Sequence, residues 1–241
     1  MARRTDEIGF GGLRLIQDTD YFCYGTDAVL LADFASSGKF KTAADLGTNN
    51  GIIPLLLSEL TAAEKITGIE LQTEAAALAS ENVAANGLSD RINIVNADVL
   101  DVSKILPKGS FEAVTANPPY FQAGGGLLTG DPIKRAARHE ITAALADFVE
   151  CASYLLAPGG AFYLIHRPQR LADIFTLCTG VNLEPKRMRM IVPHAGDSPN
   201  LVLLEFRKNG GRELKVMPEL AVYSRDGGYT DEVRKIYRIS P

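Results

Sequence analysis

Hydrophobic and polar positions alternate along residues 26–208 with two periods, one helical and one extended. The helical period predicts helices at 26–35, 51–60, 73–87, 145–160 and 170–181. Short apolar runs predict strands at 42–47, 65–71, 91–98, 111–117, 161–166, 187–193 and 200–208. Thr26 is a candidate N-cap, Thr73 stands at a helix start, Gly87 is a helix stop, and Pro54 falls in a first turn, where proline is tolerated. The chain therefore alternates strand and helix through most of its length.

This alternation predicts a parallel sheet with helices on both faces. The last two strands are separated by a loop too short for a helix, so they must run antiparallel as a hairpin. The layout resembles class I methyltransferases: an α/β, Rossmann-like fold with a seven-stranded, mostly parallel sheet and a C-terminal antiparallel hairpin. We expect one methyltransferase domain over 1–241, divided into an N-terminal cap and first helix (1–41), a core sheet (42–208) and a C-terminal edge extension (209–241).

Composition narrows the class of protein. The 241 residues are 46% hydrophobic and 22% charged, and no run of about 18 apolar residues predicts a membrane span. Three dispersed cysteines (Cys23, Cys151, Cys178) and three scattered histidines predict neither a disulfide framework nor a metal site, and they fit buried thiols in a cytoplasmic protein. The net charge of −4 argues against nonspecific wrapping of nucleic acid, although local basic clusters occur.

Ligands of such sheets bind beyond the carboxyl ends of the strands. The first strand ends in "ADLGTNNGIIP", where Asp45 and Gly47 lead into a tight turn and Gly51 opens a helix. Glycine lets the backbone approach a ligand, and a helix N-terminus offers free N–H groups to an anion. This turn is the predicted binding place for an anionic part of a cofactor.

The next two strand ends each carry a carboxylate. Glu70 follows Gly47 by 23 residues and can accept both hydroxyls of a ribose, whereas Asp98 can accept from the exocyclic amine of adenine. GxGxxG and a P-loop lysine are both missing, which disfavours a dinucleotide or a nucleoside triphosphate and favours S-adenosylmethionine. The predicted cofactor-binding residues are Asp45, Gly47, Asn49, Gly51, Glu70, Leu71, Asp98 and Val99.

The fourth strand ends in "TANPPY", with Asn117, Pro118 and Tyr120 as candidate catalytic residues. Prolines fix the backbone and remove donors, so the turn becomes a rigid shelf of acceptors. The Asn117 side-chain oxygen and the Pro118 carbonyl can each accept one hydrogen of an –NH₂ group, which aims the nitrogen lone pair at a methyl donor. Tyr120 can stack on the planar group that bears the amine. Alignment and the two acceptors then replace a strong base.

The motif and the cofactor turn resemble those of amino-methyltransferases. Nearly the whole chain resembles the bacterial tRNA1(Val) adenine-37 N6-methyltransferase family, in "YGTDAVLLADF", "ADLGTNNGIIPLLL", "ITGIELQ", "NVAANGLSDRI", "NPPYF", "RAARHE", "LLAPGGAFYLIHRPQRL" and "NLVLLEF". The resemblance implies S-adenosylmethionine as cofactor and an adenine beside a tRNA anticodon as target. By position it assigns the cofactor to Gly47, Glu70 and Asp98, and the base to Asn117, Pro118 and Tyr120.

One position departs from the family pattern. The family turn usually reads DLGTGxG, and Asn49 replaces its second glycine here. Asparagine tolerates left-handed backbone better than other non-glycine residues, so the turn can survive. Residues 121–140 are glycine-rich and then basic. We expect a mobile loop there that orders over RNA, with Lys134, Arg135 and Arg138 on phosphates.

Two other functions compete with this hypothesis. A protein glutamine N5-methyltransferase would use the same Asn-Pro-Pro-Tyr shelf, but the first core strand near residue 42 leaves no room for the helical domain that precedes the sheet in that class. A non-catalytic RNA-binding protein on this fold is suggested only by Asn49. DNA methylation is disfavoured because no separate target-recognition domain is visible. The oligomeric state is not predicted.

Overall fold

The computed structural model describes residues 3–18, 24–118 and 132–239, with the backbone alone described within 132–143. The strands are β1 (Arg3–Glu7), β2 (Arg14–Asp18), β3 (Thr42–Leu46), β4 (Lys65–Glu70), β5 (Ile92–Asn96), β6 (Phe111–Ala116), β7 (Leu156–His166), β8 (Leu183–Val192), β9 (Leu201–Lys208), β10 (Lys215–Val216) and β11 (Leu220–Ala221). The helices are α1 (Thr26–Ser36), α2 (Ile52–Leu60), α3 (Thr73–Ala85), α4 (Pro132–Leu155), α5 (Leu171–Gly180) and α6 (Asp231–Ile236), with 3₁₀ turns η1 (Val99–Lys104) and η2 (Pro168–Arg170).

The central sheet has the strand order β10-β8-β9-β7-β6-β3-β4-β5, and β11 also pairs with β8. Strands β5, β4, β3, β6 and β7 are parallel, whereas β9 lies antiparallel between β7 and β8. The seven predicted strands are all present, and the two-residue strands β10 and β11 bring the sheet to nine. The prediction of an α/β fold with a mostly parallel sheet and an antiparallel C-terminal hairpin is confirmed.

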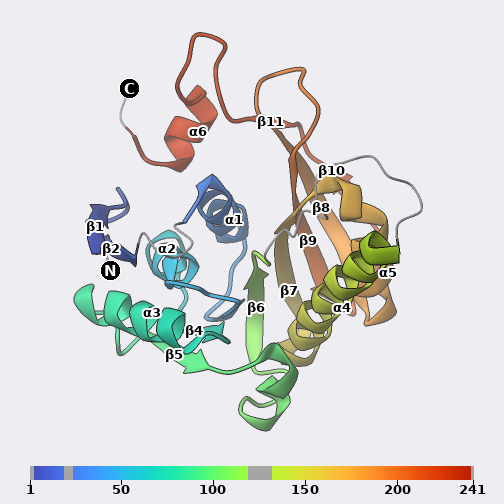
Figure 1. Ribbon diagram of the computed structural model, residues 1–241, viewed down its shortest axis with the longest axis horizontal. Helices are drawn as coiled ribbons and strands as arrows, with labels where there is room; N and C mark the ends of the chain where they lie inside the picture. The colour runs from blue at the N-terminus through green and yellow to red at the C-terminus, as the bar shows by residue number, and fades with distance from the viewer. Residues whose placement is uncertain (1–2, 19–23, 119–131, 240–241) are drawn as a thin grey trace.

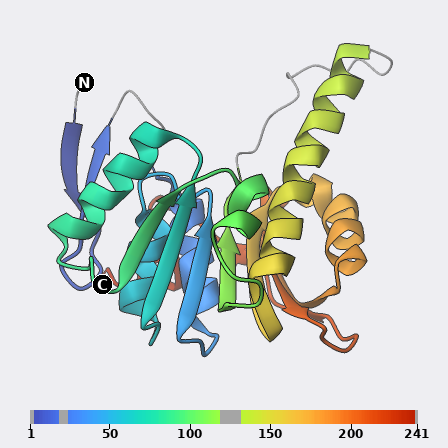
Figure 2. The ribbon, with the colours of Figure 1, turned by 90° about the horizontal axis from the view of Figure 1, so that it is seen from below.

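Helices cover both faces of the sheet (Figures 1 and 2). Alternate residues of the central strands enter two separate cores, because successive side chains of a strand point to opposite faces. On β3, Ala43 joins the core with α1 and α2, and Ala44 joins the core with α4 and α5. On β7, Tyr163 joins the core with α1 and α2, and Phe162 joins the core with α4 and α5. Burial on both faces explains why these strands are nearly continuous apolar runs.

Three local predictions were wrong. Helix α4 starts at Pro132, so residues 132–140 are helical and not loop, and it ends at Leu155, five residues before the predicted end. Pro158, Gly159 and Gly160, the last residues of the helix predicted at 145–160, instead lie inside β7, where Gly159 has φ +78 and the β6–β7 register shifts. Thr26 is the first residue of α1 and caps nothing, since Gly25 is the N-cap.

The N-terminal hairpin β1–β2 was not predicted, because the sequence of β1, RRTDE, contains no apolar residue. Asn82 of α3 and Asn86, the C-cap of that helix, bind the hairpin through their side chains. Asn82 accepts from Ile16 N at 2.7 Å and donates to Ile16 O at 3.0 Å, and Asn86 makes the same pair of bonds to Arg14 at 2.9 and 2.7 Å. Helical neighbours four residues apart rise about 6 Å, which nearly matches the roughly 6.8 Å between alternate residues of a strand. The two asparagine side chains therefore make hydrogen bonds to the backbone of β2 of the kind that a neighbouring third strand would make.

Two further predictions concern the cysteine side chains and the possibility of a membrane-spanning helix. Cys151 and Cys178 are free and buried, as predicted, and Cys23 lies outside the described residues. None of the helices in the described ranges combines the length and apolar character needed to cross a bilayer.

Replacing Asn82 by alanine is expected to lower the free energy of unfolding by about 2–3 kcal/mol, because buried backbone groups lose their partners. Asn82 is fully buried and also donates to Asn50 O at 3.0 Å. Asn86→Ala is the matched control and should cost less than about 1 kcal/mol, because water reaches its partners. Urea denaturation measures both, and equal losses would contradict the bridging role of Asn82.

Candidate functional site

The register of the parallel strands aligns their carboxyl ends at one edge of the sheet. Leu46 pairs with Ala116 and with Ile69, and Glu70 pairs with Asn96. The ends of β5, β4, β3 and β6 therefore lie side by side. The chain order reverses between β3 and β6, and such a switch point is where open α/β sheets bind ligands. This edge therefore brings together the predicted site residues that lie on the four strand ends and that the structure describes.

The turn between β3 and α2 contains three left-handed residues: Gly47 at φ +69, Asn49 at φ 50 and Gly51 at φ +83. Asn49 thus adopts the conformation that was expected of an asparagine replacing glycine. The N–H groups of Gly47 and Thr48 donate to Ile69 O at 2.9 and 3.0 Å, which ties the turn to the end of β4. The backbone then enters α2 with its first N–H groups directed at this edge.

Helices approach the turn closely at both glycines. A Cβ on Gly47 would lie 3.3 Å from the Phe148 ring of α4, and one on Gly51 would lie 3.2 Å from Ala79 Cβ of α3. Side chains at these positions would therefore push on α4 or α3 as well as strain the backbone. The two glycines therefore allow α4 and α3 to pack closely against the turn.

Buried polar atoms gather under the turn. Asp45 Oδ2, Thr48 Oγ1 and Asn50 Oδ1 have no partner of hydrogen-bond geometry among the described residues, although Asp45 Oδ1 accepts from the Thr115 hydroxyl at 2.7 Å. Burial raises the pKa of Asp45 to about 7; the Thr115 and Thr48 hydroxyls beside the carboxyl offset part of that rise, and the charge of Glu70 adds to it. Polar groups without partners are costly in a protein interior, so this turn fits a polar ligand better than an apolar one.

Glu70 braces the same turn from β4. Its two carboxylate oxygens accept from the backbone N–H groups of Asn49 at 2.8 Å and Gln72 at 2.9 Å. A carboxylate has about four acceptor positions, so these two bonds leave acceptor positions on Glu70, which is 8% exposed. The residue predicted to hold ribose hydroxyls therefore also fixes the shape of the cofactor turn.

The end of β5 leads into the turn η1. Asp98 caps it by accepting from Leu100 N at 3.0 Å. Leu71 after β4 and Leu100 in η1 are each 62% exposed, so apolar surface flanks this end of the site. Leu71 was among the predicted cofactor residues, and Leu100 was not, because a lone leucine has no distinguishing pattern.

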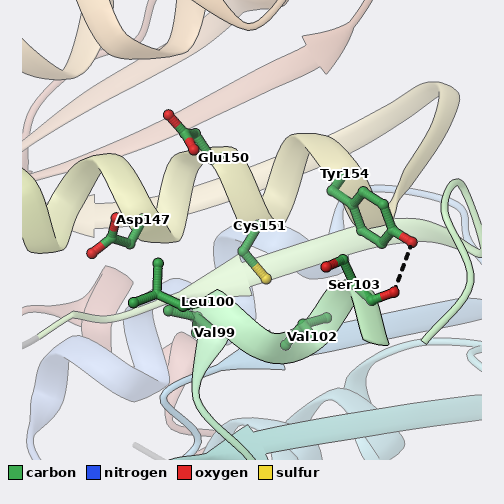
Figure 3. Close-up of a pocket in the computed structure, with 8 residues that line it drawn as sticks. All are labelled: Val99, Leu100, Val102, Ser103, Asp147, Glu150, Cys151 and Tyr154. Atoms are coloured by element: carbon green, nitrogen blue, oxygen red, sulfur yellow. Dashed lines mark hydrogen bonds between the residues drawn. The ribbon is translucent and has the colours of Figure 1, made fainter. Parts of the chain in front are cut away.

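A cavity of about 200 Å³ lies between η1 and α4, lined in part by Val99 and Leu100. Figure 3 shows the Cys151 sulfur pointing from α4 toward η1. Burial, and then the charge of Asp98, raise the pKa of the Cys151 thiol to about 12, so it stays protonated and is a poor nucleophile. The Tyr154 hydroxyl lies at the other end of the cavity, within 3.4 Å of Ser103 O and 3.3 Å of Leu106 O, and it can donate to either carbonyl. This cavity extends the predicted adenine end of the site without offering a reactive group.

The tip of β6 carries the partly buried Asn117 and the buried Pro118. The Asn117 amide nitrogen donates to Asp27 Oδ2 at 3.0 Å, across 90 residues of sequence. Asp27 was missed, since an acidic residue in a first helical turn is common and nothing in the sequence links it to Asn117. Tyr120 lies outside the described residues.

The predicted RNA-contacting residues lie on α4, whose backbone alone is described there. The side chains of Lys134, Arg135 and Arg138 lie outside the described residues, so their contacts stay predictions. Among the side chains that the structure does describe, no group of three or more His, Cys, Asp or Glu residues is arranged to hold a metal ion.

The raised pKa of Asp45 predicts a pH-dependent stability. The unfolded chain releases this proton near the ordinary pKa of 3.8 and the folded protein near 7, so the folded state binds more protons between these values. The stability associated with the neutral carboxyl is present below about pH 4 and is lost as the pH rises to about 7. Asp45→Asn should remove this fall in stability with rising pH, because an amide side chain does not ionise.

The measurement is urea denaturation of Asp45→Asn and the original protein at pH 4.5 and 8. Between pH 4.5 and pH 8, the original protein should lose about 2–4 kcal/mol more unfolding free energy than the asparagine variant. This range follows from roughly 1.4 kcal/mol per pKa unit. Asp226→Asn, which removes an exposed carboxylate, is the control. A difference that is the same at both pH values would contradict the raised pKa.

Comparison with known proteins places this geometry in a family. Residues 20–180 match the methyltransferase small domain family. A tRNA1(Val) (adenine(37)-N6)-methyltransferase of Porphyromonas gingivalis is 34% identical over 84% of this chain and 81% of that protein. One of Aeromonas hydrophila is 29% identical over 90% and 88%. A predicted O-methyltransferase from Agrobacterium tumefaciens has a similar crystal structure, with a TM-score of 0.71 and 26% identity over 88% of this chain and 95% of that one.

The match to the family covers the whole edge where β3, β4, β5 and β6 end, and the curated relatives align with most of both chains. The strand order with an antiparallel β9 between β7 and β8 agrees with this grouping. The chain therefore belongs to the methyltransferase small domain family and, within it, to the tRNA1(Val) (adenine(37)-N6)-methyltransferases.

Proposed function

We propose that this protein transfers a methyl group from S-adenosylmethionine to the exocyclic N6 of an adenine beside the anticodon of a tRNA. The observation that carries the proposal is the pairing of β3 with β6, which sets the Gly47–Gly51 turn next to Asn117 and Pro118. A cofactor turn and an amine-binding shelf on adjacent strands are what direct methyl transfer requires. The names of the curated relatives support the tRNA adenine as substrate.

The residues at the three strand ends fit an adenosine with a charged tail. Glu70 has acceptor capacity left for ribose hydroxyls, and Asp98 can accept from the adenine amine while it caps η1. The exposed Leu71 offers an apolar surface to a planar base. The first N–H groups of α2 suit a carboxylate. When bound, S-adenosylmethionine supplies an electrophilic methyl group on a sulfonium.

Asn117 and Pro118 orient the nucleophile. The Asn117 amide oxygen and the Pro118 carbonyl accept the two hydrogens of the adenine amine and turn its lone pair out of conjugation, toward the methyl group. These acceptors become stronger partners as the nitrogen gains positive charge, which lowers the barrier. The excess proton leaves to solvent after transfer. Tyr120 is proposed to stack on the flipped base, as aromatic side chains do in enzymes that act on nucleobases.

The start of α4 supports contact with RNA near the same edge. Figure 2 shows α4 projecting past the carboxyl ends of the strands, on the side where β6 ends. Lys134, Arg135 and Arg138 belong to this projecting part, and we propose that they bind phosphates there. A cluster of cations on an otherwise acidic protein would give binding that weakens with salt.

The alternatives differ in the atom or molecule that is methylated. Transfer to an oxygen, as in the name of the Agrobacterium protein, usually needs a base to remove the hydroxyl proton. Asn117 and Pro118 present acceptors for two N–H groups instead, which favours an amine or amide nitrogen. Adenine is favoured over a protein glutamine by the names of the curated relatives. The left-handed Asn49 keeps the turn intact, which favours an enzyme over a non-catalytic RNA-binding protein.

Asn117→Ala is expected to lower kcat by at least about a hundredfold, because it removes an acceptor that acts most strongly in the transition state. Its affinity for S-adenosylmethionine should stay the same in calorimetry. Mass spectrometry of tRNA incubated with the protein and the cofactor measures N6-methyladenine. Asn93→Ala, which removes an exposed amide on β5, is the control. An Asn117→Ala protein that methylates adenine at a near-normal rate would refute the shelf mechanism.

Glu70→Ala is expected to weaken S-adenosylmethionine binding by about 1–3 kcal/mol, the scale for losing a charged hydrogen-bonding group. Part of that loss comes from the turn, because Asn49 and Gln72 lose their acceptor. Glu74→Ala removes an exposed carboxylate from the first turn of α3 and should leave the affinity unchanged. Calorimetry measures both variants, and unchanged affinity in Glu70→Ala would overturn the ribose assignment.

A further inference from the structure

Asp27 links the first turn of α1 to the tip of β6. Its Oδ2 accepts from the Asn117 amide nitrogen at 3.0 Å, and its Oδ1 accepts from the N–H of Ala28 at 3.0 Å. Both carboxylate oxygens are therefore engaged by named donors. The two residues lie 90 positions apart, so only the packing of α1 on the sheet brings them together.

The carboxylate is held in place by its surroundings. Residues 28–31 that follow it are buried against the sheet, which anchors the start of α1. Gly25 leaves room for the carboxylate, since a Cβ there would lie 2.7 Å from Asp27 Oδ1. An acidic residue in a first turn is also stabilised by the helix dipole. Asp27 is consequently a fixed point against which another side chain can be oriented.

A carboxylate accepts hydrogen bonds and donates none, whereas the two ends of an amide differ. The amide nitrogen of Asn117 must face Asp27, because the opposite rotamer would set an oxygen against an oxygen. The amide oxygen is then directed away from α1. In the proposed reaction this oxygen is the acceptor for the adenine amine, so the orientation of Asn117 decides whether the shelf can work.

We propose that Asp27 is a positioning residue for methyl transfer, which fixes the Asn117 amide with its oxygen toward the substrate amine. This inference rests on the proposed function of Asn117. Asp27 does not touch the reacting atoms and acts only through Asn117. Its removal should therefore affect the rate without changing the affinity for S-adenosylmethionine.

A double-mutant cycle with Asp27→Ala and Asn117→Ala tests the inference. In the original protein, Asp27→Ala should lower kcat between about tenfold and a hundredfold, the scale for misplacing a catalytic group, with little change in KM for tRNA. In the Asn117→Ala background the same change should have less than about a twofold effect, because residues that act as one unit are not additive. Asp27→Asn, which keeps one acceptor oxygen, should restore part of the rate.

Two controls separate this role from a structural one. Asp33→Ala removes another carboxylate from α1 and should leave kcat unchanged. The side-chain NH₂ signal of Asn117 in an ¹⁵N–¹H spectrum should be protected from exchange with water, and Asp27→Ala should abolish that protection. Equal fold losses in both backgrounds, or an Asn117 signal indifferent to Asp27→Ala, would overturn the inference.

The two proposals can fail separately. If Asn117→Ala keeps the full rate, the proposed function of the shelf fails, and the NH₂ signal still decides whether Asp27 orients the amide. The other outcome is that Asn117→Ala abolishes activity while Asp27→Ala, made alone in the original protein, keeps the full rate. The shelf mechanism then stands, and the positioning role of Asp27 is refuted.

Discussion

Burial of both faces of the parallel sheet leaves the carboxyl edge of the strands as the place where the polar groups of the candidate site lie together. Two apolar cores, one under α1 and α2 and one under α4 and α5, take the alternate side chains of the central strands such as β3 and β7. A polar group on either face would need a partner inside a core. At the carboxyl edge, by contrast, backbone N–H groups and side chains meet solvent or ligand. The register of β3, β4, β5 and β6 then decides which residues share that edge.

Several residues at the edge serve the fold and the proposed chemistry together. Glu70 closes the turn through the N–H groups of Asn49 and Gln72, and the same carboxylate is the proposed ribose acceptor. Asp98 caps η1 and is the proposed adenine acceptor. A site built this way is rigid before any ligand arrives, which reduces the entropy lost on binding. It also means that substitution of these residues changes shape and affinity at once.

Elements outside the core sheet complete the site. Asn82 of α3 ties the hairpin β1–β2 to the cofactor turn by bonding both Ile16 and the carbonyl of Asn50. The start of α1 contributes Asp27 to the tip of β6. Figure 1 shows the hairpin, α1 and α3 grouped on one side of the sheet. The N-terminal region is thus part of the support for the site and not a separate appendage.

Local patterns in the sequence determined the strands and helices of the core, the antiparallel hairpin, and the glycines, carboxylates and amide at the strand ends, because each follows from period, turn chemistry or position after an apolar run. Asn49 in the left-handed region was foreseeable for the same reason. The hairpin at β1, the early start of α4 and the pairing of Asp27 with Asn117 were not. β1 has no apolar residue, and a hydrogen bond across 90 residues depends on how α1 packs. Only the tertiary structure decides such contacts, since their energy comes from groups that the chain brings together after its local elements have formed.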